Sequence, residues 1–149
     1  MKRIVVIGAG EIGSTIAGML GAAGDYEVTV VDRSAEQLSA LDALGPVRRL
    51  QADVGDPQDL QPILGGAFAV LSAAPYYLTQ GIARAARAAG VHYLDLTEDV
   101  AAARVVRGLA ADASTAFIPQ CGLAPGFITI AAHDLISRFD SLQDVSMGV

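Results

Sequence analysis

The chain has 149 residues, a net charge of −6 and a hydrophobic fraction of 52%. This length suits one domain with a single core, and the apolar content argues against a disordered chain. The negative charge argues against a nucleic-acid partner, and no uncharged apolar run reaches the roughly 18 residues of a membrane span. One cysteine fits a reducing cytoplasm, and no Cys/His cluster has the spacing of a metal site.

Short β-branched runs alternate with amphipathic segments along the whole chain. Strands are expected at residues 3–7, 27–31, 47–52, 67–73, 91–96 and 115–118, and from residue 142 onward. Helices are expected at residues 11–23, 34–44, 57–64, 77–89, 99–113 and 127–139. This alternation, with its short loops, predicts an α/β fold in which a doubly wound parallel sheet carries helices on both faces.

Capping residues support several of these helix boundaries. Ser34 opens a capping box with Gln37, and Leu44 ends the apolar stripe of the helix that follows. Asp56 caps a short helix that has Pro57 at its first position, where no N–H group is needed. Gly90 is expected to end the helix before it.

The turn after the first strand reads Gly8-Ala9-Gly10-Glu11-Ile12-Gly13 and fits the pattern G-x-G-x-x-G. The first glycine permits the tight turn, the second leaves room for a pyrophosphate, and the third lets helix and strand pack closely. The pattern alone is common, but here it follows a strand and opens a helix whose N–H groups can bind phosphates. It therefore predicts a Rossmann dinucleotide-binding site that includes Gly8, Gly10, Glu11, Ile12 and Gly13, although a glycine turn without a ligand fits the pattern too.

Asp32 lies nineteen residues beyond Gly13, close to the spacing of ~20 expected for a ribose-binding acid. Its carboxylate would accept hydrogen bonds from the adenosine ribose. That favours NAD, because the 2′-phosphate of NADP would meet a negative charge. Arg33 could pair with such a phosphate, so NADP remains possible.

The segments "GAGEIG", "ADVGD", "AAPYY", "HYLDLTED" and "GLAPGF", in this order, resemble the saccharopine dehydrogenase-like family. That family includes saccharopine reductases, lysine 6-dehydrogenase-like enzymes and carboxynorspermidine dehydrogenases. The resemblance implies an N-terminal NAD(P)-binding domain, here residues 1–141, joined to a substrate and dimerisation domain. We expect residues 142–149 to begin a strand that leads into this second domain, and the sequence to be a piece of a longer, homodimeric protein.

The resemblance also implies roles for residues that follow the strands, where ligands bind in an open parallel sheet. It places Asp32, Arg33 and Ser34 at the adenosine half of the cofactor. It places Asp53 and Val54 near the adenine, and Ala73, Ala74 and Pro75 beside the nicotinamide ribose. On the substrate side it implies Tyr76, Asp95, Gly122 and Leu123, with Asp95 toward the substrate amine.

Each substrate-side residue also has a structural interpretation. Asp95 could instead cap the helix that follows its strand. Cys121 could be a small buried apolar residue or could line the site. Of Tyr76 and Tyr77, one is expected to pack and the other to face the crevice, with the family position favouring Tyr76. The sequence shows no catalytic acid–base pair, so the catalytic residues stay unknown.

The sequence thus predicts the cofactor half of an NAD(P)-dependent oxidoreductase. Hydride would pass between nicotinamide and the carbon that bears the amine or imine of a lysine- or saccharopine-like amino acid. This chain alone would bind the dinucleotide and turn nothing over. The alternative is a non-catalytic nucleotide-sensing domain that regulates a transporter, which does not require "HYLDLTED" or "GLAPGF".

Overall fold

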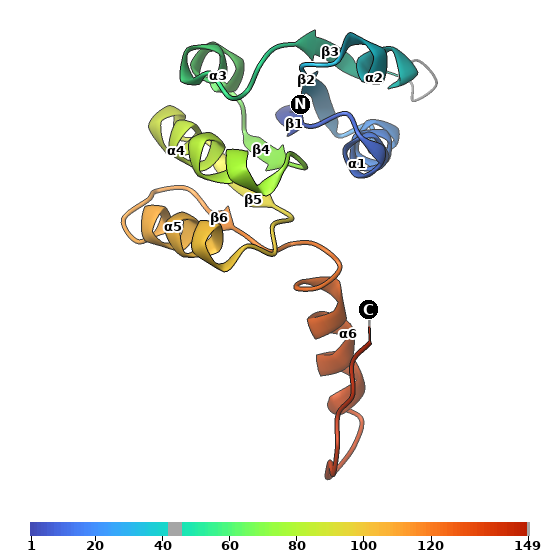
Figure 1. Cartoon of the computed structure of the whole chain (residues 1–149). Helices are drawn as coiled ribbons and strands as arrows, with labels where there is room; N and C mark the ends of the chain where they lie inside the picture. The colour runs from blue at the N-terminus through green and yellow to red at the C-terminus, as the bar shows by residue number, and fades with distance from the viewer. Residues whose placement is uncertain (42–45, 149) are drawn as a thin grey trace.

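The computed structural model describes residues 1–41 and 46–148 and contains a six-stranded sheet (Figure 1). The strands pair in parallel in the order β3-β2-β1-β4-β5-β6. They are β1 (Lys2–Ile7), β2 (Tyr26–Asp32), β3 (Arg48–Gln51), β4 (Ala69–Ser72), β5 (His92–Asp95) and β6 (Phe117–Ile118). The chain therefore runs from β1 to one edge, returns to β4 beside β1, and continues to the other edge, which confirms the doubly wound fold.

Helices cover both faces of this sheet (Figure 1). They are α1 (Glu11–Ala23), α2 (Ala35–Ser39), α3 (Pro57–Leu64), α4 (Thr79–Ala89), α5 (Val100–Ala110) and α6 (Phe127–Ile136), and a 3₁₀ turn, η2 (Tyr76–Leu78), precedes α4. Because side chains alternate along a strand, Val5 and Ile7 pack with α3, α4 and α5, whereas Ile4 and Val6 pack with α1 and α2. Each side chain of this kind that is fully buried stabilises the fold by roughly 1.5–3 kcal/mol.

The predicted capping residues lie at helix ends. The Ser34 side chain accepts a hydrogen bond from the Gln37 N–H at 3.3 Å, and the Asp56 carboxylate accepts one from the Gln58 N–H at 2.8 Å. Gly90 adopts the left-handed conformation, with φ 66°, that ends α4. Asp99, the first residue of the predicted 99–113 helix, is its N-cap and accepts from the Ala102 N–H at 2.6 Å, and the helix ends at Ala110 rather than at residue 113. Leu44 lies outside the described residues.

Several strands are shorter than predicted. Residues 115 and 116 precede β6 rather than belong to it, because β6 pairs only with β5, at Tyr93 and Leu94. The strand expected from residue 142 is absent: residues 142–148 are irregular, with no neighbouring strand among the described residues to share backbone hydrogen bonds. None of the described helices is long and apolar enough to cross a membrane.

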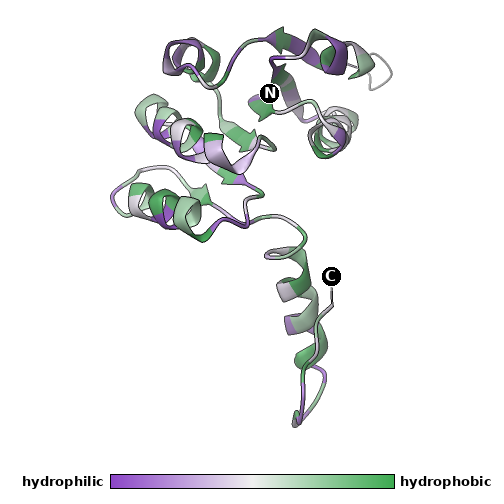
Figure 2. Cartoon of the chain, viewed as in Figure 1, coloured by the Kyte–Doolittle hydropathy of each residue, from purple (hydrophilic) through white to green (hydrophobic). Residues whose placement is uncertain are grey.

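Residues 127–148, the C-terminal arm, extend away from the sheet (Figure 1). The segment after α6 runs back along that helix. No residue of α6 is buried, and its large apolar side chains, among them Phe127, Ile130 and Leu135, are exposed. Figure 2 shows the same helix as largely hydrophobic. Helix α6 of the arm therefore leaves large apolar side chains exposed to solvent.

Candidate cofactor site

The three glycines of the first turn are needed for different reasons. Gly8 has φ 102°, a conformation that side chains disfavour, and a Cβ there would lie 2.9 Å from the Ala73 carbonyl oxygen. A Cβ on Gly13 would lie 1.8 Å from the Gly8 carbonyl oxygen, so only glycine lets α1 pack against β1. A Cβ on Gly10 would meet no described atom within 4 Å. Since Gly10 lines a cleft, a side chain there would occupy space open to a ligand.

The N-terminus of α1 is open to an anion. Side chains cap α2, α3 and α5 through Ser34, Asp56 and Asp99, whereas Gly10 gives α1 no side-chain cap in the described structure. The first-turn N–H groups of a helix lack partners within the helix and carry partial positive charge. This end of α1 therefore fits a diphosphate.

Asp32 connects the glycine turn to the loop after β2, a role that the sequence did not reveal. Its Oδ2 atom accepts a hydrogen bond from the Ala9 N–H, and its Oδ1 atom accepts one from the Ser34 N–H, both at 2.8 Å. A carboxylate has about four acceptor positions, so ribose hydroxyls can still bind the same oxygens. Asp32 thus fixes the shape of the turn and stays available to a ligand.

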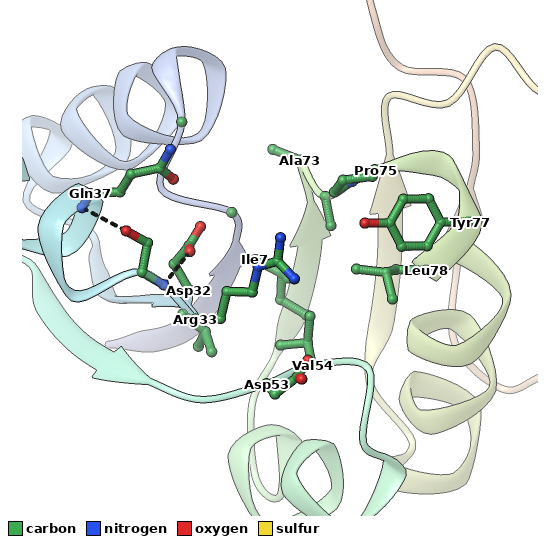
Figure 3. A pocket seen from close by; sticks show the side chains of 15 residues that line it. Ile7, Asp32, Arg33, Gln37, Asp53, Val54, Ala73, Pro75, Tyr77 and Leu78 are labelled. Carbon is green, nitrogen blue, oxygen red and sulfur yellow. Dashed lines mark hydrogen bonds between the residues drawn. The ribbon is translucent and has the colours of Figure 1, made fainter.

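A first cleft, of about 590 Å³, lies at the carboxyl ends of β1, β2 and β4 (Figure 3). The Arg33 side chain projects into it, opposite the wall formed by Pro75 and Tyr77 (Figure 3). Sequence reasoning missed the lining residues Gln37 and Leu78. The cleft brings together predicted cofactor residues from four segments: Gly8, Gly10, Asp32, Arg33, Ser34, Asp53, Val54, Ala73, Ala74 and Pro75.

A second cleft, of about 430 Å³, lies beyond β4 and β5. Ala73 and Ala74 line both clefts, so the loop after β4 separates them. Ile12 and Tyr76 belong to the second cleft, while Glu11 is exposed and lines neither. Residues 96–99, which follow β5, form another wall, as expected for residues beyond the carboxyl end of a parallel strand. Two clefts beside an uncapped helix end match the two halves of a dinucleotide joined by a diphosphate.

The two tyrosines after β4 do not divide their roles as predicted. Tyr76 and Tyr77 are each 63% exposed, so neither packs in the core. Tyr76 faces the second cleft and Tyr77 faces the first. Their rings meet edge to face at 6.0 Å, since both belong to the short turn η2.

Asp95 is buried, with 1% of its surface exposed, and lines neither cleft. Its Oδ1 atom accepts hydrogen bonds from the Thr97 and Gln120 N–H groups, both at 3.0 Å. Burial, and then the charge of Asp95, raise the pKa of the Tyr93 hydroxyl. The same two causes raise the pKa of the exposed Cys121 thiol.

The turn written "GLAPGF" is held by its own backbone. The Phe127 N–H donates to the Gly122 carbonyl at 2.9 Å. Gly126 has φ 133°, and a Cβ there would lie 2.2 Å from the Gly122 oxygen, so the fold itself requires this glycine. Gly122 and Leu123 line neither of the two clefts. The described residues contain no group of three or more His, Cys, Asp or Glu side chains that could hold a metal ion.

Solved structures share this architecture. A saccharopine dehydrogenase (L-Glu forming) from Saccharomyces cerevisiae is 22% identical with a TM-score of 0.80; the match covers 92% of this chain and 31% of that one. The NAD(P)-binding domain of an exopolyphosphatase-related protein from Archaeoglobus fulgidus is 21% identical with a TM-score of 0.69, covering 93% and 100%. Pen from Bacillus thuringiensis is 17% identical with a TM-score of 0.70, covering 79% and 49%. These likenesses support the fold, and the chain spans about a third of the yeast enzyme.

The sequence itself matches a protein family. Residues 4–118, more than half of the chain, fit the family described as "Saccharopine dehydrogenase NADP binding domain". The matched segment contains the glycine turn, the lining of both clefts and all six strands of the described sheet apart from the first two residues of β1. The chain therefore belongs to the family of saccharopine dehydrogenase NADP-binding domains and binds NAD(P).

Proposed function

We propose that this chain is the cofactor half of an oxidoreductase acting on a C–N bond of a lysine- or saccharopine-like amino acid. The observation that carries the proposal is the pair of clefts that share Ala73 and Ala74 beside the uncapped end of α1. In this arrangement the adenosine lies in the first cleft, the diphosphate lies at Gly10, and the nicotinamide lies in the second cleft. The bound nicotinamide supplies hydride transfer.

The residues around the cofactor bind and orient it. Asp32 holds the glycine turn and accepts from the ribose, while Asp53 and Val54 flank the adenine. In the second cleft Tyr76 and Glu98 face the space next to the nicotinamide. An acidic wall there favours a substrate that carries an ammonium group. The homodimer, the cytoplasmic location and the substrate contacts of Gly122 and Leu123 belong to the same proposal.

We infer that the first cleft accepts NADP as well as NAD. The Arg33 side chain projects into this cleft, where it can pair with a 2′-phosphate. Replacing Arg33 with glutamine should weaken NADP about tenfold and leave NAD nearly unchanged. Asp32→Asn removes the charge that opposes a 2′-phosphate and keeps one acceptor oxygen while an NH2 group replaces the other, so the ratio of NADP to NAD affinity should rise. Calorimetric titration of both cofactors measures these ratios, and equal losses in Arg33→Gln would contradict the assignment.

The reaction is tested with this chain joined to the second, substrate-binding domain that we propose for the full protein. Nicotinamide absorbance is followed with lysine, saccharopine and a 2-hydroxy acid as candidate substrates. Turnover of an amine but not of the hydroxy acid supports the C–N assignment. Titration of the 149-residue chain with ATP tests the sensor alternative: binding of ATP in preference to NAD and NADP would favour a regulatory domain.

A further inference from the structure

Asp95 is a buried acid to which the proposed chemistry gives no task. It ends β5, and only 1% of its surface is exposed. No ion pair with Asp95 occurs in the described part of the chain. A charge in this position is expensive unless hydrogen bonds compensate it, so its bonding partners indicate what it does.

Those partners belong to two segments that are distant in sequence. One oxygen of Asp95 accepts from the Thr97 N–H, on the wall of the second cleft, and from the Gln120 N–H, at the start of the turn after β6. The Asp95 carbonyl oxygen accepts from the Cys121 N–H at 2.8 Å. A single residue therefore joins the cleft wall to this turn.

Three features of the turn indicate that it needs these hydrogen bonds to Asp95. Gln120 has φ 65°, the left-handed conformation that costs energy for any residue other than glycine. β6, which precedes the turn, has only two residues and pairs with β5 alone. Gly122 lies against the Leu96 carbonyl, since a Cβ there would be 3.3 Å from that oxygen. Without the hydrogen bonds to Asp95, both the turn and the adjoining wall of the second cleft could move.

The other carboxylate oxygen faces the protein interior. Asp95 Oδ2, Tyr93 OH and Ser72 Oγ are buried, and none has a partner of standard hydrogen-bond geometry within the described structure. The Tyr93 ring is fully buried and stacks on Phe117 of β6 at 5.6 Å. The hydrogen bonds that orient Asp95 are therefore the two that its Oδ1 atom accepts from the Thr97 and Gln120 N–H groups.

We propose that Asp95 is a positioning residue for the nicotinamide end of the cofactor: its buried carboxylate holds the 120–126 turn against the wall of the second cleft. The placement of nicotinamide in that cleft rests on the function proposed above. The hydrogen bonds between Asp95 and the turn do not depend on the proposed function and can be measured separately. Holding the turn requires the acceptor oxygen of Asp95 and not its negative charge.

Three variants separate these contributions. Asp95→Asn keeps an acceptor oxygen of the same reach and removes the charge. Asp95→Ser can still accept locally from the Thr97 N–H but is too short to reach Gln120. Asp95→Ala removes both bonds. Asp56→Ala is the matched control, because it removes a helix-capping carboxylate that bonds to the Gln58 N–H and lines neither cleft.

Hydrogen exchange measures whether Asp95 holds the turn, and it needs no ligand. We expect the amides of residues 120–123 to exchange about tenfold faster in Asp95→Ala and Asp95→Ser, and at the wild-type rate in Asp95→Asn and Asp56→Ala. Exchange in β1, measured in the same samples, distinguishes local opening from global unfolding. Unchanged exchange of the turn in a folded Asp95→Ser variant would overturn the proposal.

The affinity for NAD, compared with that for ADP-ribose, measures the effect of the turn on the nicotinamide end of the cofactor. NAD carries the nicotinamide and ADP-ribose does not, so a displaced turn should weaken NAD about tenfold and leave ADP-ribose within about twofold. Asp95→Asn should restore NAD affinity. Equal loss of both ligands would indicate a merely structural residue, and an Asn variant as weak as Ala would mean that the charge contacts the ligand; either result overturns the proposal. If the wild-type chain bound neither NAD nor ADP-ribose, the proposed function would fail. Hydrogen exchange alone would then test whether Asp95 holds the turn.

Discussion

The sheet body (residues 2–118) and the C-terminal arm (127–148) are both rich in apolar residues but differ in what covers them. In the body, strands and helices bury each other's apolar side chains in two clusters, one on each face of the sheet. In the arm, α6 has a comparable apolar surface and no buried residue. Apolar spacing therefore predicts that a helix forms, whereas burial depends on which elements the fold places beside it.

The sharpest test of this contrast compares one residue type in two helices. Ile82 of α4 is fully buried, and Ile130 of α6 is 70% exposed. Ile82→Ala should lower the free energy of unfolding by about 2–5 kcal/mol, because it leaves a cavity between α4 and the sheet. Ile130→Ala should change it by less than about 0.5 kcal/mol. Urea unfolding measures both, and equal losses would show that the arm is packed in solution.

Substitutions at two glycines extend the comparison of body and arm to the backbone. Gly13→Ala places a Cβ against the Gly8 oxygen inside the body and should cost about 3 kcal/mol or more. Gly126→Ala meets a similar clash with the Gly122 oxygen at the base of the arm. It should open that turn and leave the unfolding of the body nearly unchanged. Global unfolding by urea and local hydrogen exchange of residues 122–128 separate the two outcomes; a body destabilised equally by both changes would refute the distinction.

The body should also lose stability in alkali through Tyr93. Burial and the charge of Asp95 raise the pKa of this phenol, so the folded state favours its neutral form. That stability is complete below about pH 10, where the unfolded phenol ionises, and is lost as the pH rises toward the folded value. Above about pH 10 the free energy of unfolding should fall by up to about 1.4 kcal/mol per pH unit more than in Tyr93→Phe. Tyr77→Phe, which changes an exposed ring, should follow the wild type.

The smallest expected effect lies at the junction between body and arm. Cys121 is the single cysteine of the chain, and burial together with Asp95 raises the pKa of its thiol. Asp95→Asn removes the negative charge and should move the pH profile of iodoacetamide alkylation to lower pH. Asp99→Asn is the control and should leave it near the wild-type profile. A profile that is unchanged in Asp95→Asn would mean that the carboxylate does not act on the thiol.

The sequence was sufficient for the elements of the body. The span of α1 was predicted to the residue, since Gly10 precedes it and Gly24 ends it in the left-handed conformation. Most residues predicted to bind the cofactor line one cleft, because strand ends meet at one edge of a parallel sheet. Strand lengths were less predictable: β6 is limited by pairing with β5, which depends on register rather than on residue type.

Contacts between distant residues could not be predicted from the sequence. Asp32 bonds to the Ala9 N–H and Asp95 to the Gln120 N–H, partners that are 23 and 25 residues away. In sequence Asp32 appeared as a ribose contact and Asp95 as either a substrate contact or a helix cap, since both lie at the end of a strand. Their additional roles depend on where the fold brings a distant N–H group, and no local pattern encodes this.

The central claim is that one dinucleotide spans the two clefts across the uncapped end of α1. A crystal structure of the chain with NAD or NADP tests it most directly. We expect the diphosphate at the N–H groups of residues 10–13, the adenosine between Arg33 and Val54, and the nicotinamide beside Tyr76. A cofactor bound elsewhere, or an adenosine half in the second cleft, would contradict this account.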